Sequence, residues 1–98
     1  MVLDLEITEI VEDRLRTQIK GKTQVINKEH GECTGWVTLI MERCAVMFDI
    51  GEVVKAAADG VGVWLERGGV SYPAELKEIS VFKQGSQGSQ WREWVATF

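Results

Sequence analysis

The sequence has few of the side chains that bind metals or act as nucleophiles: one histidine and two cysteines in 98 residues. A structural zinc site needs four ligands, usually in closely spaced pairs, and His30, Cys33 and Cys44 do not supply such a set. Cys33 lies three residues from His30, so a thiolate–imidazole pair is geometrically possible, but no third residue that would orient it can be identified. The composition therefore predicts no metal and no cofactor, and it favours a protein that is not an enzyme.

The two cysteines are predicted to remain free thiols. Cys33 and Cys44 lie near opposite ends of a predicted strand over Thr34–Glu42. At about 3.3 Å per residue they would be over ~30 Å apart, whereas a disulfide needs Cα atoms within about 7 Å. Free cysteines commonly serve as small buried hydrophobic residues.

Long apolar runs and an export signal are also missing. No run approaches the roughly 18 apolar residues of a membrane span, and residues 1–12 are acidic and alternate in polarity, unlike a signal peptide. We therefore expect a cytoplasmic protein that does not contact membranes. Its 98 residues fit a single domain over 1–98, and the net charge of −4 argues against general binding of nucleic acid.

The segment from Arg14 to Ile26 alternates in polarity over its whole length, and the rest of the predicted fold is organised around it. One face carries Leu15, Thr17, Ile19, Gly21, Thr23 and Val25, and the other carries Arg16, Gln18, Lys20, Lys22 and Gln24. A period of two over this length predicts a long β-strand with one buried face and one solvated face.

The N-terminal segment is predicted to pair with this strand as a hairpin that turns at Asp13–Arg14. Leu3, Leu5 and Ile7 alternate with polar residues, and the phase then slips, which predicts a β-bulge near Thr8 or Glu9. The predicted register sets Ile10 opposite Thr17, Ile7 opposite Ile19, Glu6 opposite Lys20 and Asp4 opposite Lys22. The charges of residues 1–13 and 14–28 would then cancel across the hairpin.

The remaining elements follow from similar patterns. Thr34–Glu42 is apolar on both faces and is predicted to be a central strand. A helix is expected over 49–59, because Asp49 and Glu52 have capping-box spacing and an apolar stripe with helical spacing follows. Strands over 61–66 and 70–83 flank the turn at 67–69, with a short helix over 74–78 as the alternative, and a last strand spans 91–98.

The predicted order is β-β-β-α-β-β-β, an α+β fold that is mostly β. It corresponds to one curved antiparallel sheet, or a small barrel of five to six strands, with one short helix against it. The order of its first five strands is analogous to that of the oligonucleotide/oligosaccharide-binding (OB) barrel. The analogy concerns element order alone.

A basic stripe on the long strand is a candidate nucleic-acid site. Arg16, Lys20 and Lys22 share one face, and Trp36 on the next strand could stack a base. The alternative is that Asp4 and Glu6 neutralise the stripe. Because the opposing charges cancel, we consider the second interpretation the better one.

Tryptophan is abundant, with four in 98 residues. Trp91 and Trp94 are three residues apart in the predicted last strand, so they point to opposite faces and one of them is exposed unless both faces are covered. Exposed tryptophans favour a protein interface, and the candidate residues are Trp36, Trp91, Arg92 and Trp94. A homodimer formed through the last strand is a specific form of this hypothesis. The alternative, of about equal weight, is that one of Trp91 and Trp94 is in the core and the other lies flat over a neighbouring strand beside Arg92.

Three functions are compatible with these features. The first is a small binding or assembly module that contacts another protein or itself. The second is single-strand nucleic-acid binding through Arg16, Lys20, Lys22 and Trp36. The third is a small-molecule pocket between helix and sheet, lined by Trp36, Met41 and Phe48.

Overall fold

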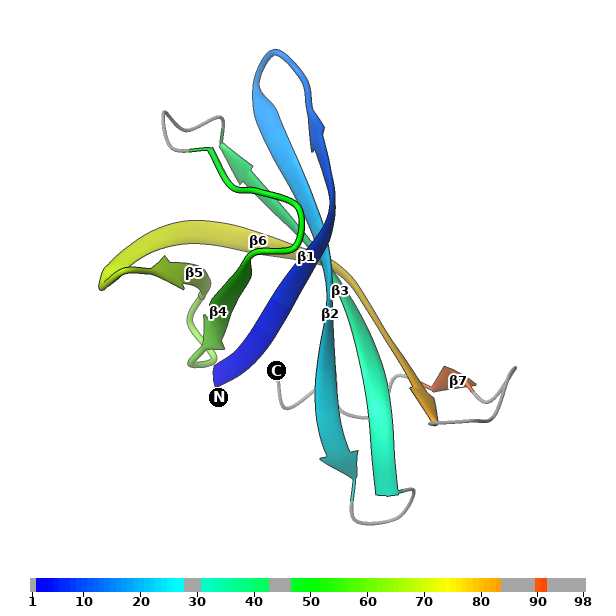
Figure 1. The fold of residues 1–98 in the computed structure, drawn as a ribbon. Coiled ribbons are helices and arrows are strands. Elements are labelled where there is room, and N and C mark those ends of the chain that lie inside the picture. The colour runs from blue at the N-terminus through cyan, green and yellow to red at the C-terminus, as the bar shows by residue number, and fades with distance from the viewer. Residues whose placement is uncertain (1, 28–30, 43–46, 84–89, 92–98) are drawn as a thin grey trace.

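The computed structural model describes residues 2–27, 31–42, 47–83 and 90–91. Within these ranges the chain forms seven β-strands and no helix (Figure 1). The strands are β1 (Val2–Glu12), β2 (Arg16–Asn27), β3 (Gly31–Glu42), β4 (Val53–Ala58), β5 (Val63–Arg67), β6 (Val70–Lys83) and β7 (Gln90–Trp91). Over the same ranges, no helix has the length and apolar character needed to cross a membrane.

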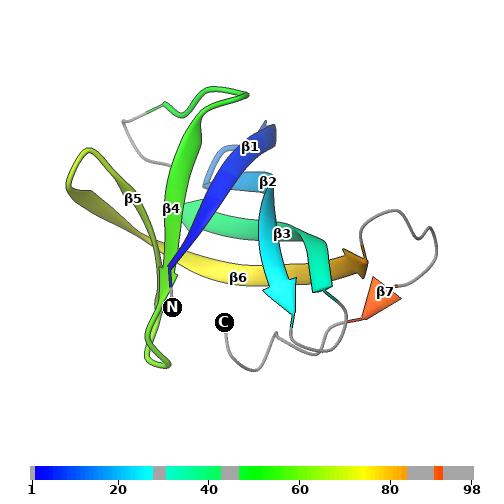
Figure 2. The same ribbon diagram turned by 60° about the horizontal axis from the view of Figure 1, so that its bottom comes forward.

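Six of the strands close into an antiparallel barrel. β1–β2–β3 and β4–β5–β6 are two successive three-stranded meanders, joined to each other by β1–β4 and β3–β6 pairing. β7 adds to β6 outside this closed ring, as both views show (Figures 1 and 2). The prediction of a small curved antiparallel barrel is confirmed, whereas the α+β assignment is wrong because the described elements are all strands.

Two long strands change partner along their length, and this gives the barrel its shape. β1 pairs with β4 over Val2–Glu6 and with β2 over Glu6–Glu12. β6 pairs with β5 over Val70–Ala74 and with β3 over Glu75–Lys83. Beyond each change of partner the neighbouring strands diverge, so the barrel wall has two openings.

The core is built from the inward face of the six barrel strands and from Phe48, which precedes β4. Its buried members are Leu5, Ile7, Ile19, Val37, Leu39, Met41, Phe48, Val54, Ala56, Leu65 and Ile79. On β2 the predicted inner face is largely correct, because Thr17, Ile19 and Thr23 are buried. Leu15 is the exception: it lies in the β1–β2 turn and is 77% exposed.

The segment predicted to be a helix, residues 49–59, is instead a turn followed by β4. Glu52 N donates to Asp49 O at 3.1 Å, and Gly51 has a positive φ of 87°. Asp49 N also donates to Glu52 Oε2 at 3.4 Å, so the two capping-box residues do interact. Here they close a turn, and no helix follows.

The chain after this turn is extended because β1 offers it a strand edge. Val54, Ala56 and Ala58 are buried, whereas Val53 and Lys55 are exposed, which is the period of a strand. The same apolar residues also fit a helical stripe, and pairing with β1 and β5 decides between the two periods. The adjacent β-branched residues Val53 and Val54 further favour the strand.

The alternative short helix over 74–78 is also wrong, because β6 is continuous through Pro73. Pro73 pairs with Trp64 of β5, while pairing between β3 and β6 begins only at Glu75. At Pro73, β6 therefore pairs with a strand on one side only. The N–H group that proline lacks is not needed for a hydrogen bond to a second strand. The turn before it matches prediction: Gly68 and Gly69 have positive φ and join Arg67 to Val70.

The β1–β2 hairpin forms with its bulge at Thr8, as predicted, but its register differs by two residues. Ile10 pairs with Ile19, Ile7 with Gly21 and Glu6 with Lys22. The predicted two-residue turn is replaced by a four-residue one over Asp13–Arg16. In this turn Asp13 Oδ1 accepts from the N–H groups of Leu15 (2.9 Å) and Arg16 (2.8 Å).

Candidate functional site

Trp36 lies at the centre of an array of side chains on the outer face of the barrel. The array, here called the Trp36 face, consists of Lys20, Lys22 and Gln24 on β2, Thr34, Trp36 and Thr38 on β3, and Glu78, Ser80 and Phe82 on β6. Trp36 pairs with Lys22 on one side and with Ser80 on the other. Ser80 is small and buried, and the indole is half-buried.

Polar contacts hold the side chains around the indole. The Lys20 ammonium lies 5.9 Å from the centre of the Trp36 ring, within cation–π range. The Lys22 ammonium lies 3.2 Å from Glu6 Oε2 on β1. Next to the array, Lys77 Nζ donates to Gln18 Oε1 at 3.0 Å and links β6 to β2 across β3.

The predicted basic stripe is therefore only partly assembled. Lys20, Lys22 and Trp36 meet on one face, but the Lys22 charge is compensated by Glu6. Arg16 lies at the far end of β2, where it pairs in register with Glu42. The prediction that β1 carboxylates neutralise the stripe is confirmed for Glu6. This carboxylate pairs with Lys22, whereas the predicted register set it opposite Lys20.

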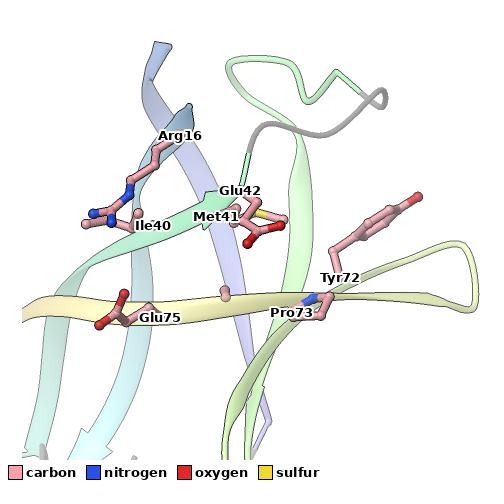
Figure 3. A pocket seen from close by; sticks show the side chains of 8 residues that line it. Arg16, Ile40, Met41, Glu42, Tyr72, Pro73 and Glu75 are labelled. Carbon is pink, nitrogen blue, oxygen red and sulfur yellow. The ribbon is translucent and has the colours of Figure 1, made fainter. Parts of the chain in front are cut away.

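Arg16 belongs to a different feature, an open cavity of about 460 Å³ where β3 and β6 diverge (Figure 3). Its apolar lining consists of Ile40, Met41, Pro73 and Ala74, with Tyr72 beside them and Arg16, Glu42 and Glu75 at the charged margin. Two carboxylates and one guanidinium, all on exposed residues, give this margin a net negative charge. The cavity was not predicted, because it depends on where the β3–β6 pairing stops.

The predicted small-molecule pocket does not form from its three residues. Met41 and Phe48 are buried in the core, whereas Trp36 lies on the opposite face of β3 from Met41. Phe48 packs edge-on against Tyr72, with ring centres 5.7 Å apart. The helix that would have covered such a pocket is strand β4.

A second open cavity, of about 510 Å³, lies where β1 and β2 diverge. It is lined by Val2, Leu3, Asp4, Glu6, Lys22, Thr23, Gln24 and Val53. Figure 2 shows the start of β1 and the end of β2 separating on this side of the barrel. Val2 and Val53 are 60% and 63% exposed at its margin, so this opening carries apolar surface that sequence analysis did not single out.

The other predicted sites are only partly within the described residues. Cys33 is buried with a free thiol, and Cys44 and His30 lie outside the described ranges. Trp91 is in β7, where its backbone pairs with Val81. The rest of the predicted last strand, including Arg92 and Trp94, lies outside the described ranges. Within the described part of the chain, no three acidic, histidine or cysteine side chains cluster as a metal site would require.

Comparison with protein-family models, curated proteins and solved structures found no significant match.

Proposed function

We propose that this protein is a small non-enzymatic binding module that contacts another protein through the Trp36 face. The observation that carries the proposal is the position of Trp36, at the centre of a three-stranded outer surface and framed by polar side chains. A central tryptophan inside a polar rim is the usual composition of an interface hot spot. The indole supplies apolar area, and the rim supplies hydrogen bonds and excludes water.

Intramolecular contacts position side chains in and beside the Trp36 face. The Lys20 ammonium lies over the indole, Lys22 pairs with Glu6, and Lys77, next to the face, donates to Gln18. Side chains that are already fixed lose less conformational entropy on binding, so more of the contact energy appears as affinity. We place the module in the cytoplasm, because the free thiol of Cys33 suits a reducing compartment.

Photo-crosslinking from the Trp36 face tests the proposal. A photoreactive phenylalanine analogue replaces Phe82, a half-buried aromatic residue of the same array, and the control variant carries it at Val61, which is 92% exposed in the β4–β5 turn. We expect a discrete protease-sensitive adduct in cells from position 82 only, and its loss on adding Trp36→Ala. The mass of the adduct tells a second copy from another protein, and either result supports protein contact.

Two outcomes would overturn this function: no adduct from position 82, or equal adducts from positions 82 and 61. Thermal unfolding of Trp36→Ala is measured in parallel, because an unfolded variant would also lose the adduct. If Trp36→Ala is unfolded, Trp36→Phe is used in its place, because phenylalanine keeps an aromatic ring in the array. We expect it to weaken the adduct without unfolding the barrel.

Single-strand nucleic-acid binding is the second candidate, favoured by the position of Lys20 over the Trp36 ring. A base could stack on the indole while lysines contact phosphates. It is the weaker candidate because Glu6 already pairs with Lys22 and Arg16 lies at the far end of the strand. Titration with a thymidine oligonucleotide at low salt tests it: salt-sensitive quenching of fluorescence that Trp36→Phe abolishes would replace the first proposal.

A further inference from the structure

The cavity between β1 and β2 borders a strand edge that lacks the usual protection against pairing. Thr23–Asn27 of β2 pairs with β3 on one side. On the other side β1 has already turned away, and the β1–β2 ladder ends at Lys22, so no described strand pairs there. This five-residue edge contains no charged residue and no proline, the devices with which natural sheets block edge-to-edge association.

Two other open edges among the described strands are protected. β6 carries Pro73 in the stretch that pairs only with β5. The final part of β1, which pairs only with β2, carries Glu9 and Glu12. Either feature opposes the addition of a further strand. Unlike these two edges, Thr23–Asn27 has neither a proline nor a charged residue.

We propose that this edge is a dimerisation site, at which Thr23–Asn27 pairs antiparallel with the same residues of a second copy. A segment without charge can face itself without like-charge repulsion. Pairing about a two-fold axis uses one edge from each copy, so the assembly closes at two and does not extend into a fibre. This edge shares only Gln24 with the Trp36 face, and neither proposal depends on the other.

The apolar residues around the same opening support a second copy as the occupant. Ile26, on the outer face of the edge, is 85% exposed, and Val2 and Val53 line the margin of the adjoining cavity. Two-fold pairing brings the second copy's Ile26 towards this margin and covers apolar surface on both copies. The shared edge is only five residues long, so we expect a weak dimer with a dissociation constant on the order of micromolar.

Sedimentation equilibrium of the full chain tests the dimer. We expect the wild type to pass from monomer to dimer over roughly 1–100 μM, and Ile26→Lys to remain monomeric because it places two like charges beside the shared edge. Val61→Lys is the matched control: it introduces the same charge at an exposed aliphatic residue of the β4–β5 turn, away from the edge, and should dimerise as the wild type does. A monomeric wild type, or an Ile26→Lys variant that dimerises normally, would overturn the proposal.

Hydrogen exchange at two protein concentrations locates the contact without any substitution. We expect backbone amides within residues 23–27 to exchange more slowly at the higher concentration, and those of residues 9–12 to be unaffected. Protection of 23–27 that does not change with concentration would assign the edge to a segment of the same chain and overturn dimerisation there. Concentration-dependent protection confined to residues 34–38 and 78–82, in the β3 and β6 parts of the Trp36 face, would equally exclude this site, while supporting the proposed function.

Discussion

Arg67 and Glu52 form the most extensively bonded ion pair described in the structure, and it anchors the turn before β4. Arg67 Nε donates to Glu52 Oε1 at 2.7 Å, and a terminal nitrogen of the same guanidinium lies 2.6 Å from that oxygen. The other terminal nitrogen donates to Met47 O at 3.1 Å. The guanidinium also lies 5.0 Å from the centre of the Phe48 ring, so a single side chain holds the entry into β4 against the β5–β6 turn.

A double-mutant cycle on Glu52→Gln and Arg67→Gln should give a coupling free energy of about 1–2 kcal/mol, because the pair is partly buried and its hydrogen bonds are charge-assisted. The side chains are 32% and 20% exposed for Arg67 and Glu52, against 43% for both members of the Lys22–Glu6 pair. The same cycle on Lys22 and Glu6 is the control and should give only a few tenths of a kcal/mol. Urea unfolding measures both, and equal couplings would contradict the anchoring role.

Gly21→Ala should destabilise the barrel by about 1–3 kcal/mol, because it overpacks a place where β1 crosses close to β2. A Cβ at Gly21 would lie 2.7 Å from the backbone oxygen of Glu6 and 2.7 Å from Leu5 Cγ. Gly62→Ala is the control: its nearest neighbours are atoms of the Trp64 ring, beginning at 3.3 Å, and a side chain can shift more easily than backbone. A midpoint of unfolding unchanged by Gly21→Ala would show that β1 can move away.

Asp59 should make the stability of the β4–β5 turn depend on pH. Its carboxylate accepts from the N–H groups of Val61 (2.8 Å) and Gly62 (3.1 Å), and these bonds lower its pKa in the folded state. A lowered folded-state pKa means that the stabilisation is present above the unfolded-state pKa of about 3.9 and is lost as the pH falls through the folded-state value.

Asp59→Asn is the matching variant, because its amide oxygen can accept the same bonds without titrating. Unfolding of both proteins is compared between pH 7 and pH 2. We expect the advantage of the wild type over Asp59→Asn to shrink as the pH falls below about 4. An advantage that stays constant over this range would show that Asp59 does not contribute through its charge.

Cys33 should be inert towards alkylating reagents in the folded protein, because its side chain is fully buried and Sγ lies 3.4 Å from Gly31 O. Cys44→Ser leaves it as the sole thiol, and mass spectrometry follows modification by iodoacetamide with and without urea. We expect modification only at urea concentrations that unfold the barrel. Rapid modification without denaturant would place Cys33 at an accessible surface.

The local patterns were sufficient for several elements of this fold. Polarity alternation along β2 identified that strand, because a sheet with one buried face imposes a period of two. Apolar residues on both faces of 34–42 indicated that β3 is a central strand. The Gly68–Gly69 pair identified the β5–β6 turn, since both residues adopt positive φ. Part of the candidate site could be predicted for the same reason: alternation puts Lys20 and Lys22 on the outer face of β2.

Contacts between distant segments decided the rest. The apolar residues of 53–58 fit a helix or a strand equally well, and only the edges offered by β1 and β5 made them β4. The β1–β2 register depended on the length of the turn that Asp13 closes. With this turn, Glu6 lies opposite Lys22, and Lys20 contacts the Trp36 ring.

The amino-acid sequence by itself determined which face of each strand is apolar, because that follows from side-chain chemistry and backbone period alone. The tertiary structure decided which strands are neighbours and where their pairing stops. Those choices place β6 beside Trp36 and leave Thr23–Asn27 without a described partner on one side. They could not be read from local patterns, because the hydrogen bonds and packing that fix them join residues far apart in the chain.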